Sequence, residues 1–195
     1  MTNTALDERP EGALSIRKAT VADAEALSAF AARVFRETFA PDNDPMDMDA
    51  YLSEAFAPEK QAVEIADGSG VCLLAEVGET LAGYAFLRIE AADGRDPSVA
   101  LPVELPVELP VELQRFYVDY AWHGRGVAPA LMTACIDTAR ARGSATMWLG
   151  VWERNPRAIR FYQKHGFVDI GAKEFRLGTD LQTDRVMSRS VALSR

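Results

Sequence analysis

The spacing of hydrophobic residues changes several times along the chain, and each spacing predicts one type of element. Between residues 20 and 38, apolar side chains recur every three or four positions, which predicts a helix. They are Leu27, Phe30, Ala31, Val34 and Phe35. A short alternating strand is predicted before this helix at 14–17, and a second helix after it at 48–57. The apolar runs at 71–77 and 81–89 are separated by three turn residues and predict a β-hairpin.

The second half of the chain alternates between strand-like and helix-like spacing. It predicts a strand at 111–118, a helix at 126–143, a strand at 146–151, a helix at 156–166, and a hairpin of strands at 167–175 and 184–191. Asn155 suits the N-cap of the second of these helices, and Pro156 suits its first position, where a missing N–H costs nothing. Elements in this order predict an α/β fold, with a mixed, mostly antiparallel sheet and helices on both faces.

Composition and charge fit a single globular domain. A chain of 195 residues is long enough for one well-buried domain and too short for two ordinary ones. We expect residues 1–12 to form a flexible tail and residues 13–191 to form the domain. The net charge of −8 argues against a nucleic-acid partner, because no basic excess offsets the phosphates. The same acidity either steers a cationic substrate toward the protein or only keeps the protein soluble.

The sequence also bears on compartment and assembly. The N-terminus lacks the apolar core of a signal peptide, and no apolar run approaches the roughly 20 residues that span a bilayer. Cys72 and Cys135 lie in apolar runs, which predicts buried free thiols in a reducing compartment. We therefore expect a cytoplasmic protein with no membrane partner. No group of residues has metal-ligand spacing, so we expect no metal ion. The sequence sets no oligomeric state and allows a homodimer.

A Val-Glu-Leu-Pro unit repeats between residues 101 and 113 with a period of four. Its prolines, Pro102, Pro106 and Pro110, exclude a helix interior and a central strand, because proline has no N–H to donate. We interpret residues 100–111 as an extended, polyproline-like insertion that leads into the following strand. This insertion is either a plain surface feature or a segment that docks a partner or another subunit.

The strand at 111–118 leads into a helix through a turn that contains Gly124, Arg125 and Gly126. A helix N-terminus after a glycine-containing turn presents several unpaired N–H groups and the positive end of the helix dipole, which together favour an anion such as phosphate. The turn lacks the Gly-Lys-Ser/Thr ending of a Walker loop and the last glycine of a dinucleotide fingerprint. From the residues alone, an ordinary strand-to-helix turn stays open as an alternative.

Two motifs carry a resemblance to a known family. His123-Gly-Arg-Gly-Val-Ala128 resembles the Gln/Arg-x-x-Gly-x-Gly/Ala acyl-CoA pyrophosphate loop of the GCN5-related N-acetyltransferases (GNAT), with histidine in place of the usual first residue. Asn155-Pro-Arg-Ala-Ile-Arg-Phe-Tyr162-Gln-Lys-His-Gly-Phe167 resembles the second signature of that family, Asn-x-x-Ala-x-x-x-Tyr-x-x-x-Gly-Phe. Both occur in the family's order and at its usual separation. The resemblance covers residues 13–191 and implies a single GNAT domain whose sheet splays at its centre.

The resemblance also implies a cofactor and the residues that hold it. The cofactor is acetyl-CoA, with pantetheine lying between the strand at 112–118 and the strand at 146–151 and pairing with the backbone of the first. A backbone N–H of Phe116 or Val118 would bind the thioester carbonyl. The implied cofactor-binding residues are Phe116, Tyr117, Val118, His123, Gly124, Arg125, Gly126, Val127, Ala128, Asn155 and Lys164.

Two residues are candidates for proton transfer. The resemblance makes Tyr162 the general acid, because a phenol with a pKa near ~10 can protonate a leaving thiolate; the alternative is a packing aromatic. Glu112 is the candidate base, by analogy with a strand glutamate of the histone-modifying branch, and strand alternation places it on one face with Gln114, Phe116 and Val118. Glu104 and Glu108 have the same local sequence as Glu112, and a water chain is a further alternative. His165, like His123, is expected to be structural rather than catalytic.

The acceptor is expected to be a primary amine. Leu113-Gln-Arg-Phe-Tyr-Val118 and Phe175-Arg-Leu-Gly-Thr-Asp180, with Asp184 and Met187, are similar to the bacterial branch that includes polyamine acetyltransferases, which implies a small polycationic amine. Residues of the loop at 39–49 either contact that amine or form a solvated acidic loop: Phe39, Asp42, Asp44, Asp47 and Asp49. The alternatives are a protein amine, at an N-terminus or a lysine, and a non-catalytic acyl-CoA-binding module.

Overall fold

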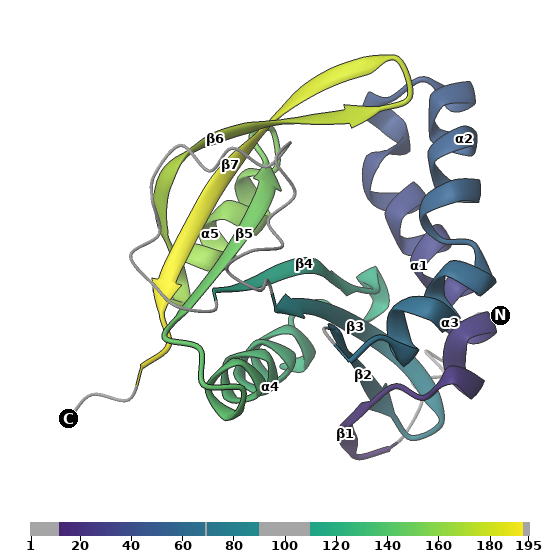
Figure 1. Cartoon of the computed structure of the whole chain (residues 1–195). Helices are drawn as coiled ribbons and strands as arrows, with labels where there is room; N and C mark the ends of the chain where they lie inside the picture. The colour runs from purple at the N-terminus through teal and green to yellow at the C-terminus, as the bar shows by residue number, and fades with distance from the viewer. Residues whose placement is uncertain (1–11, 69, 90–109, 193–195) are drawn as a thin grey trace, which may run out of the picture.

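A computed structural model of the chain describes residues 12–68, 70–89 and 110–192 (Figure 1). The tail expected at 1–12 and the insertion expected at 100–111 therefore lie almost entirely outside the described residues. The elements in chain order are β1 (Leu14–Lys18), η1 (Val21–Asp23), α1 (Ala24–Phe39), η2 (Ala40–Asp42), α2 (Pro45–Ala55), α3 (Pro58–Ala66), β2 (Gly70–Val77), β3 (Thr80–Ile89), β4 (Val111–Val118), η3 (Tyr120–Trp122), α4 (Val127–Ala141), β5 (Thr146–Trp152), α5 (Pro156–Lys164), β6 (Val168–Leu177) and β7 (Asp180–Ser190).

The described strands form one seven-stranded sheet in the order β1-β2-β3-β4-β5-β7-β6. Every neighbouring pair is antiparallel except β4 and β5, which are parallel. These two strands pair only at Val111 with Met147 and at Glu112 with Trp148. Beyond those pairs β4 and β5 separate, as Figure 1 shows. The α/β fold with a mostly antiparallel sheet that splays at its centre is confirmed.

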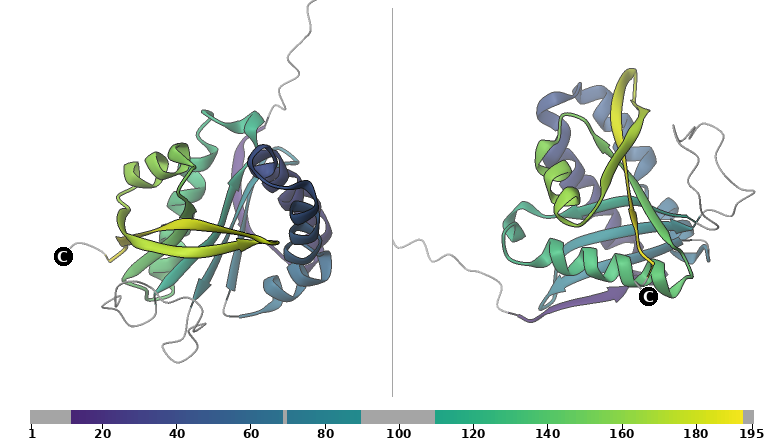
Figure 2. Two further views of the ribbon diagram at one scale, coloured as in Figure 1. Left: turned by 90° about the horizontal axis from the view of Figure 1, so that it is seen from above. Right: turned by 90° about the vertical axis from the view of Figure 1, so that its left-hand side faces the viewer.

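Helices cover both faces of the sheet (Figure 2). One buried cluster joins the sheet to α4 and α5, and its α4 members are Val127, Leu131, Met132, Cys135, Ile136 and Ala139. The other cluster joins the opposite face to α1 and α2, and its α1 members are Leu27, Phe30, Ala31, Val34 and Phe35. The periodic residues from which both helices were predicted are therefore buried. The two cysteines are buried and free.

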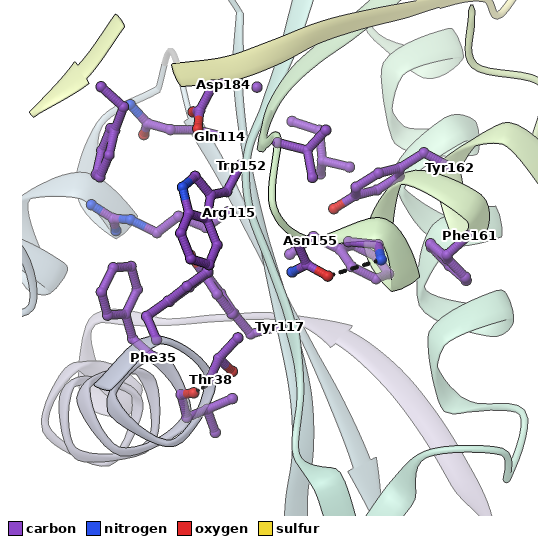
Figure 3. Close-up of a pocket in the computed structure, with 18 of the residues that line it drawn as sticks. Phe35, Thr38, Gln114, Arg115, Tyr117, Trp152, Asn155, Phe161, Tyr162 and Asp184 are labelled. Atoms are coloured by element: carbon purple, nitrogen blue, oxygen red, sulfur yellow. Dashed lines mark hydrogen bonds between the residues drawn. The ribbon is translucent and has the colours of Figure 1, made fainter. Parts of the chain in front are cut away.

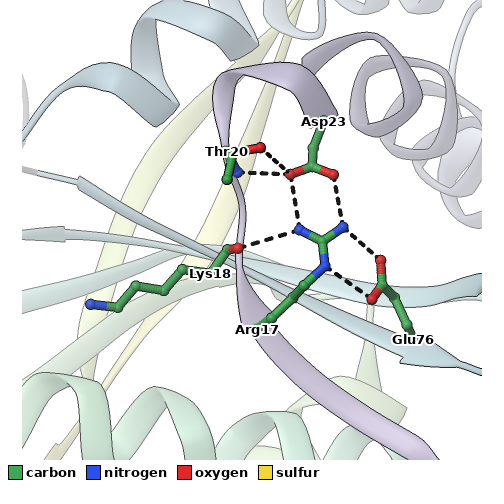
Figure 4. A network of polar contacts seen from close by, with 5 residues as sticks. All are labelled: Arg17, Lys18, Thr20, Asp23 and Glu76. Carbon is green, nitrogen blue, oxygen red and sulfur yellow. Dashed lines mark hydrogen bonds and ion pairs between the residues drawn. The ribbon is translucent and has the colours of Figure 1, made fainter.

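The start of the domain is tied to the sheet by an exposed polar network (Figure 4). The Arg17 guanidinium contacts the carboxylate of Asp23 at 2.7 Å and that of Glu76, on β2, at 2.7 Å. Asp23 also accepts a hydrogen bond from the N–H of Thr20 at 2.7 Å. The hydrogen bonds from Arg17 hold the pKa of the Asp23 carboxyl well below its usual range. This network fixes the entry into α1.

Some predicted boundaries were wrong, and one helix was missed. Helix α2 begins at Pro45 rather than at residue 48, because the Asp44 carboxylate caps the N–H groups of Met46 and Asp47. Strand β7 begins at Asp180 rather than 184. Helix α3 was missed; its fully buried side chain is that of a polar residue, Gln61, while the apolar side chain of Val63 is exposed. Within the described residues, no helix is long and apolar enough to cross a membrane.

A β-bulge in β4 overturns the predicted strand alternation. Arg115 pairs with Phe86 and Leu113 pairs with Leu87, so Gln114 is an extra residue between them. The bulge shifts the alternation by one residue. As a result Leu113 and Phe116 both belong to the cluster on the α4 and α5 side. Unbroken alternation had predicted that Glu112 shares a face with Phe116 and Val118. Because of the bulge, that prediction is wrong.

Candidate active site

A cavity of about 450 Å³ lies where β4 and β5 separate. Its lining comes from α1, α2, β4, the start of α4, β5, α5, β6 and β7. Figure 3 shows two halves: Asn155, Phe161 and Tyr162 lie on the α5 side of the strands, and Phe35, Arg115 and Asp184 lie on the other side. A ligand in this cavity would pass through the sheet from one face to the other. We call the two parts the α5 half and the acceptor half.

The α5 half begins at the N-terminus of that helix. Asn155 caps the helix, since its side-chain oxygen accepts a hydrogen bond from the N–H of Ala158 at 3.1 Å, and Pro156 takes the first helical position. The predicted N-cap is thus confirmed. The same side chain lines the cavity, so its amide NH₂ group is presented toward a ligand.

Tyr162 lies two turns further along α5 and is 7% exposed. Its ring packs edge-on against Phe116, with centroids 6.3 Å apart, and against Phe167 at 5.7 Å. Its hydroxyl is directed toward the interior of the cavity (Figure 3). Burial raises the pKa of this phenol well above its ordinary value, so the group stays protonated at neutral pH. Tyr162 can therefore donate a proton at this position.

The turn between β4 and α4 has the backbone that its glycines suggest. Gly124 has a φ of +77° and Gly126 a φ of +83°, a left-handed conformation that L side chains rarely adopt. Helix α4 begins immediately after Gly126, so its first N–H groups have no carbonyl acceptor within the helix. Pro129 falls in this first turn, where the loss of its N–H costs nothing. The geometry expected of an anion site is present.

His123 connects the end of β4 to this turn. Its Nε2 lies 2.9 Å from the carbonyl oxygen of Val118, and because a carbonyl only accepts, Nε2 carries the proton. Burial and the nearby Arg157 lower the pKa of the imidazole, so the ring is neutral at pH 7. Its Nδ1 is buried with no partner among the described residues. The histidine that replaces the family's usual residue thus offers an acceptor to a ligand.

The structure brings together only part of the cofactor-binding set. Six of these residues line the cavity: Phe116, Tyr117, Val118, His123, Ala128 and Asn155. Five do not line it: Gly124, Arg125, Gly126, Val127 and Lys164. The first four of these form the turn at the start of α4, where the Arg125 guanidinium lies 5.4 Å from the ring centroid of Trp122. Lys164 is exposed at the end of α5.

The profile of the acetyltransferase (GNAT) family matches residues 32–167. The chain belongs to this family. An uncharacterised N-acetyltransferase of Mycobacterium tuberculosis is 34% identical over 169 residues, which cover 87% of this chain and 98% of that protein. Another uncharacterised N-acetyltransferase, from Lactobacillus delbrueckii subsp. lactis, is 28% identical over 84% of this chain and 89% of that protein. The predicted enzyme class, N-acetyltransferase, is confirmed.

Solved structures with the same fold include GNAT enzymes with their cofactor. The PaiA N-acetyltransferase of Thermoplasma acidophilum, in complex with coenzyme A, has a TM-score of 0.72 and 21% identity, over 91% of this chain and 99% of that chain. YncA of Salmonella typhimurium, with acetyl-CoA, has a TM-score of 0.61 and 22% identity, over 94% of this chain and 97% of that chain. At these identities the two structures establish the GNAT fold.

Glu112 reaches the cavity from the first part of β4. It is 7% exposed, and its carboxylate lies 3.7 Å from the Nζ of Lys173 on β6. That ammonium also lies 5.2 Å from the ring centroid of Trp148, the partner of Glu112 on β5. Glu104 and Glu108, the alternatives with the same local sequence, lie outside the described residues.

Asp184 on β7 is a residue of the acceptor half that sequence reasoning did not assign to the site. Its side chain lines the cavity, and burial raises the pKa of its carboxyl to about 6. Among the described residues it makes no hydrogen bond or ion pair within the usual distances, although the charge of Lys173 favours its ionised form. The resemblance to the polyamine acetyltransferase branch included Asp184 but implied no role for it.

The carboxylates of the loop at 39–49 do not line the cavity, so the interpretation in which they contact the amine is wrong. Of its five expected residues, only Phe39 lines the cavity. Asp44 caps α2, Asp47 accepts a hydrogen bond from the Thr179 hydroxyl at 2.7 Å, and Asp49 pairs with Arg36 at 2.7 Å. These carboxylates therefore hold α1, α2 and the β6–β7 hairpin in place.

Asp184 gives the stability of the protein a measurable pH dependence. Its folded-state pKa of about 6 lies above its ordinary value of 3.8. The folded state therefore binds this proton more tightly than the unfolded state does. As a result the free energy of unfolding falls as the pH rises from about 4 to about 6. The charged and titratable groups that face it are Lys173 from β6, with its partner Glu112 from β4, and Tyr51 from α2. We expect Asp184→Asn to raise the free energy of unfolding by about 2 kcal/mol at pH 7.5 and by much less at pH 4.5.

Urea denaturation of both proteins at these two pH values measures the effect. An Asp137→Asn variant is the control, because Asp137 is 62% exposed on α4 and lies outside the cavity. A difference between Asp184→Asn and the wild type that is the same at both pH values would contradict the expectation.

Proposed function

We propose that this site transfers the acetyl group of acetyl-CoA to a primary amine. The observation that carries the proposal is the position of the Tyr162 hydroxyl, which faces the gap between β4 and β5 beside Asn155. A phenol held protonated at that point suits a leaving thiolate. It also argues against the alternative of a non-catalytic acyl-CoA-binding module, which would not need a proton donor there.

The gap between the strands supports the proposed position of the cofactor. Beyond Glu112, β4 pairs with β3 on one side and, among the described strands, has no partner on the other. Backbone N–H and C=O groups on that open side can pair with the amides of pantetheine. The N–H of Phe116 or Val118 would then bind the thioester oxygen, and the turn from His123 to Ala128 would bind the pyrophosphate. Lys164, which is exposed at the end of α5, would contact the outer part of the cofactor.

The proposed reaction needs three proton transfers. Glu112, or a water chain in its place, takes a proton from the ammonium group of the acceptor, and the free amine attacks the thioester carbon. The C–S bond breaks as the C–N bond forms. The electron pair of the broken bond goes to sulfur, which takes a proton from Tyr162. The acetylated nitrogen then loses its second proton to the Tyr162 phenolate, which leaves a neutral amide and a protonated Tyr162. The buried position of Glu112 at the edge of the cavity supports its role as base.

The class of amine is the finer part of the proposal. A polyamine and a protein amine were both expected as candidates from the sequence. The carboxylates that were expected to receive a polyamine hold α1, α2 and the β6–β7 hairpin together instead, which weakens that candidate. The proposal also includes a cytoplasmic location, which the buried free thiols of Cys72 and Cys135 favour.

The turn before α4 gives a prediction about the cofactor. Gly126→Ala places a Cβ at a φ of +83°, which costs about 1 kcal/mol of stability and distorts the N–H groups proposed to bind the pyrophosphate. We expect the Kd for acetyl-CoA, measured by calorimetry, to rise about tenfold, the equivalent of one lost charged contact.

Gly143→Ala is the matched control for this variant. Gly143 follows the other end of α4 with a φ of +78°, and as at Gly126 no atom lies within 4 Å of an added Cβ. We expect Gly143→Ala to lose similar stability and to bind acetyl-CoA like the wild type. Equal affinities of the two variants for acetyl-CoA would show that the turn does not bind the cofactor.

The direct test of the proposed function is product formation. Incubation with acetyl-CoA and a primary amine should give free CoA and the N-acetyl amine in equal amounts by mass spectrometry. Formation of CoA without acetylated amine would show hydrolysis instead of transfer.

A further inference from the structure

The acceptor half of the cavity has aromatic walls. Phe35 and Phe39 from α1 lie 4.6 Å apart between ring centroids. The ring of Phe39 meets that of Trp152 on β5 edge-on at 5.9 Å, and Tyr51 on α2 meets Phe175 on β6 edge-on at 5.8 Å. All five side chains line the cavity. Such walls bury an apolar group well and also attract a cation through the ring faces.

The charges in this half nearly cancel. Among the described residues that line the cavity, the carboxylates are Glu112 and Asp184, and Lys173 lies between them. Arg115, the other cation of this half, is neutralised by Glu64 in a two-point pair with distances of 2.5 and 3.0 Å. Counted over these described side chains alone, and with both carboxylates ionised, the balance is one negative charge.

The absence of a side chain at Gly150 makes room for these groups. A Cβ at Gly150 would lie 2.7 Å from the Cε of Lys173 and 3.0 Å from the Oδ2 of Asp184. The Asp184 carboxylate therefore lies directly over β5, next to Trp152 and on the aromatic side of the cavity (Figure 3). Of the two carboxylates, it is the one that forms no ion pair with another described residue.

We propose that the acceptor is an amine with a single cationic group on an apolar body, aromatic or alkyl, and that the Asp184 carboxylate binds its ammonium group. The proposal rests on the proposed function and names the substrate class of the same site. One ammonium balances the one remaining negative charge, and the aromatic walls receive the body. A polyamine would bring further ammonium groups toward Lys173, which repels them, and Glu112, the second carboxylate among the described lining residues, already pairs with that lysine.

The experiment measures binding and transfer separately. Calorimetry in the presence of CoA gives the Kd of 2-phenylethylamine, hexylamine, putrescine and spermidine, and release of CoA thiol from acetyl-CoA gives kcat/KM for each. Asp184→Asn keeps the shape of the side chain and removes its charge. The Asp137→Asn variant removes an exposed charge elsewhere and serves as the control.

We expect the two monoamines to have a kcat/KM at least about tenfold above that of spermidine, which corresponds to one charge-assisted contact. Asp184→Asn should raise the Kd of the monoamines by about 10- to 100-fold without changing the Kd of acetyl-CoA. Asp137→Asn should change neither.

The outcomes separate this inference from the proposed function. Acetylation of spermidine in preference to the monoamines, or monoamine binding that ignores Asp184→Asn, overturns the inference and leaves the transferase intact. Asp184-dependent binding of monoamines with no release of CoA supports the inference and overturns the transfer. Failure of every amine to bind overturns the inference.

Discussion

Tyr162→Phe is expected to lower kcat by about 100- to 1,000-fold, the usual contribution of a positioned general acid. The variant loses only the hydroxyl, and the ring keeps its edge-on contacts with Phe116 and Phe167. The loss should therefore appear in kcat and not in the Kd for acetyl-CoA. Steady-state thiol release and calorimetry on the same protein measure the two quantities.

Tyr117→Phe is the matched control for this loss. Tyr117 also lines the cavity, and burial also raises its pKa well above the ordinary value, but its ring packs against Phe35 and Tyr84 in the acceptor half. We expect it to retain most of the wild-type kcat. An equal loss of kcat in both variants would show that the Tyr162 hydroxyl acts through packing and not as an acid. Wild-type turnover by Tyr162→Phe would show that Tyr162 is not the general acid.

Glu64→Gln is expected to lower the free energy of unfolding by about 3 kcal/mol. Arg115 and Glu64 form a pair beneath the acceptor half, and their side chains are 12% and 10% exposed. Removal of the carboxylate leaves the guanidinium buried with an uncompensated charge, against the rings of Phe56 and Phe86. Because Arg115 follows the bulge at Gln114, the variant should also loosen β4 at the cavity.

The comparison is with an exposed pair of the same type. Glu76→Gln breaks one contact of Arg17, whose side chain is 42% exposed, and should cost less than about 1 kcal/mol. The double variant Glu64→Leu with Arg115→Met removes both buried charges and should recover most of the loss. Urea denaturation measures all three. Equal losses in Glu64→Gln and Glu76→Gln would contradict the account of the buried pair.

The α5 half of the site follows from local sequence. The left-handed turn needs Gly124 and Gly126, and the start of α5 needs the cap of Asn155 and the proline after it. These features depend on residues a few positions apart, so a motif records them. Tyr162 follows at a fixed helical distance. For the same reason the helix from Val127 to Ala141 was predicted almost to its ends.

The acceptor half depends on contacts that local sequence does not record. The bulge at Gln114 is set by pairing with β3, and unbroken alternation placed Glu112 on the wrong face. Asp184 meets Lys173, the partner of Glu112, only because β7 lies between β5 and β6 in the sheet. Helix α3 was missed because its buried residue is polar. In each case the deciding partner lies far away in the sequence.

Release of CoA thiol from acetyl-CoA tests the central claim most directly, with the wild type and Tyr162→Phe assayed side by side against primary amines. The account predicts amine-dependent release by the wild type, with an equal amount of N-acetyl product, and a loss of about 100-fold or more in the variant while acetyl-CoA still binds. Release that does not depend on an amine, or that is equal in the two proteins, would contradict it.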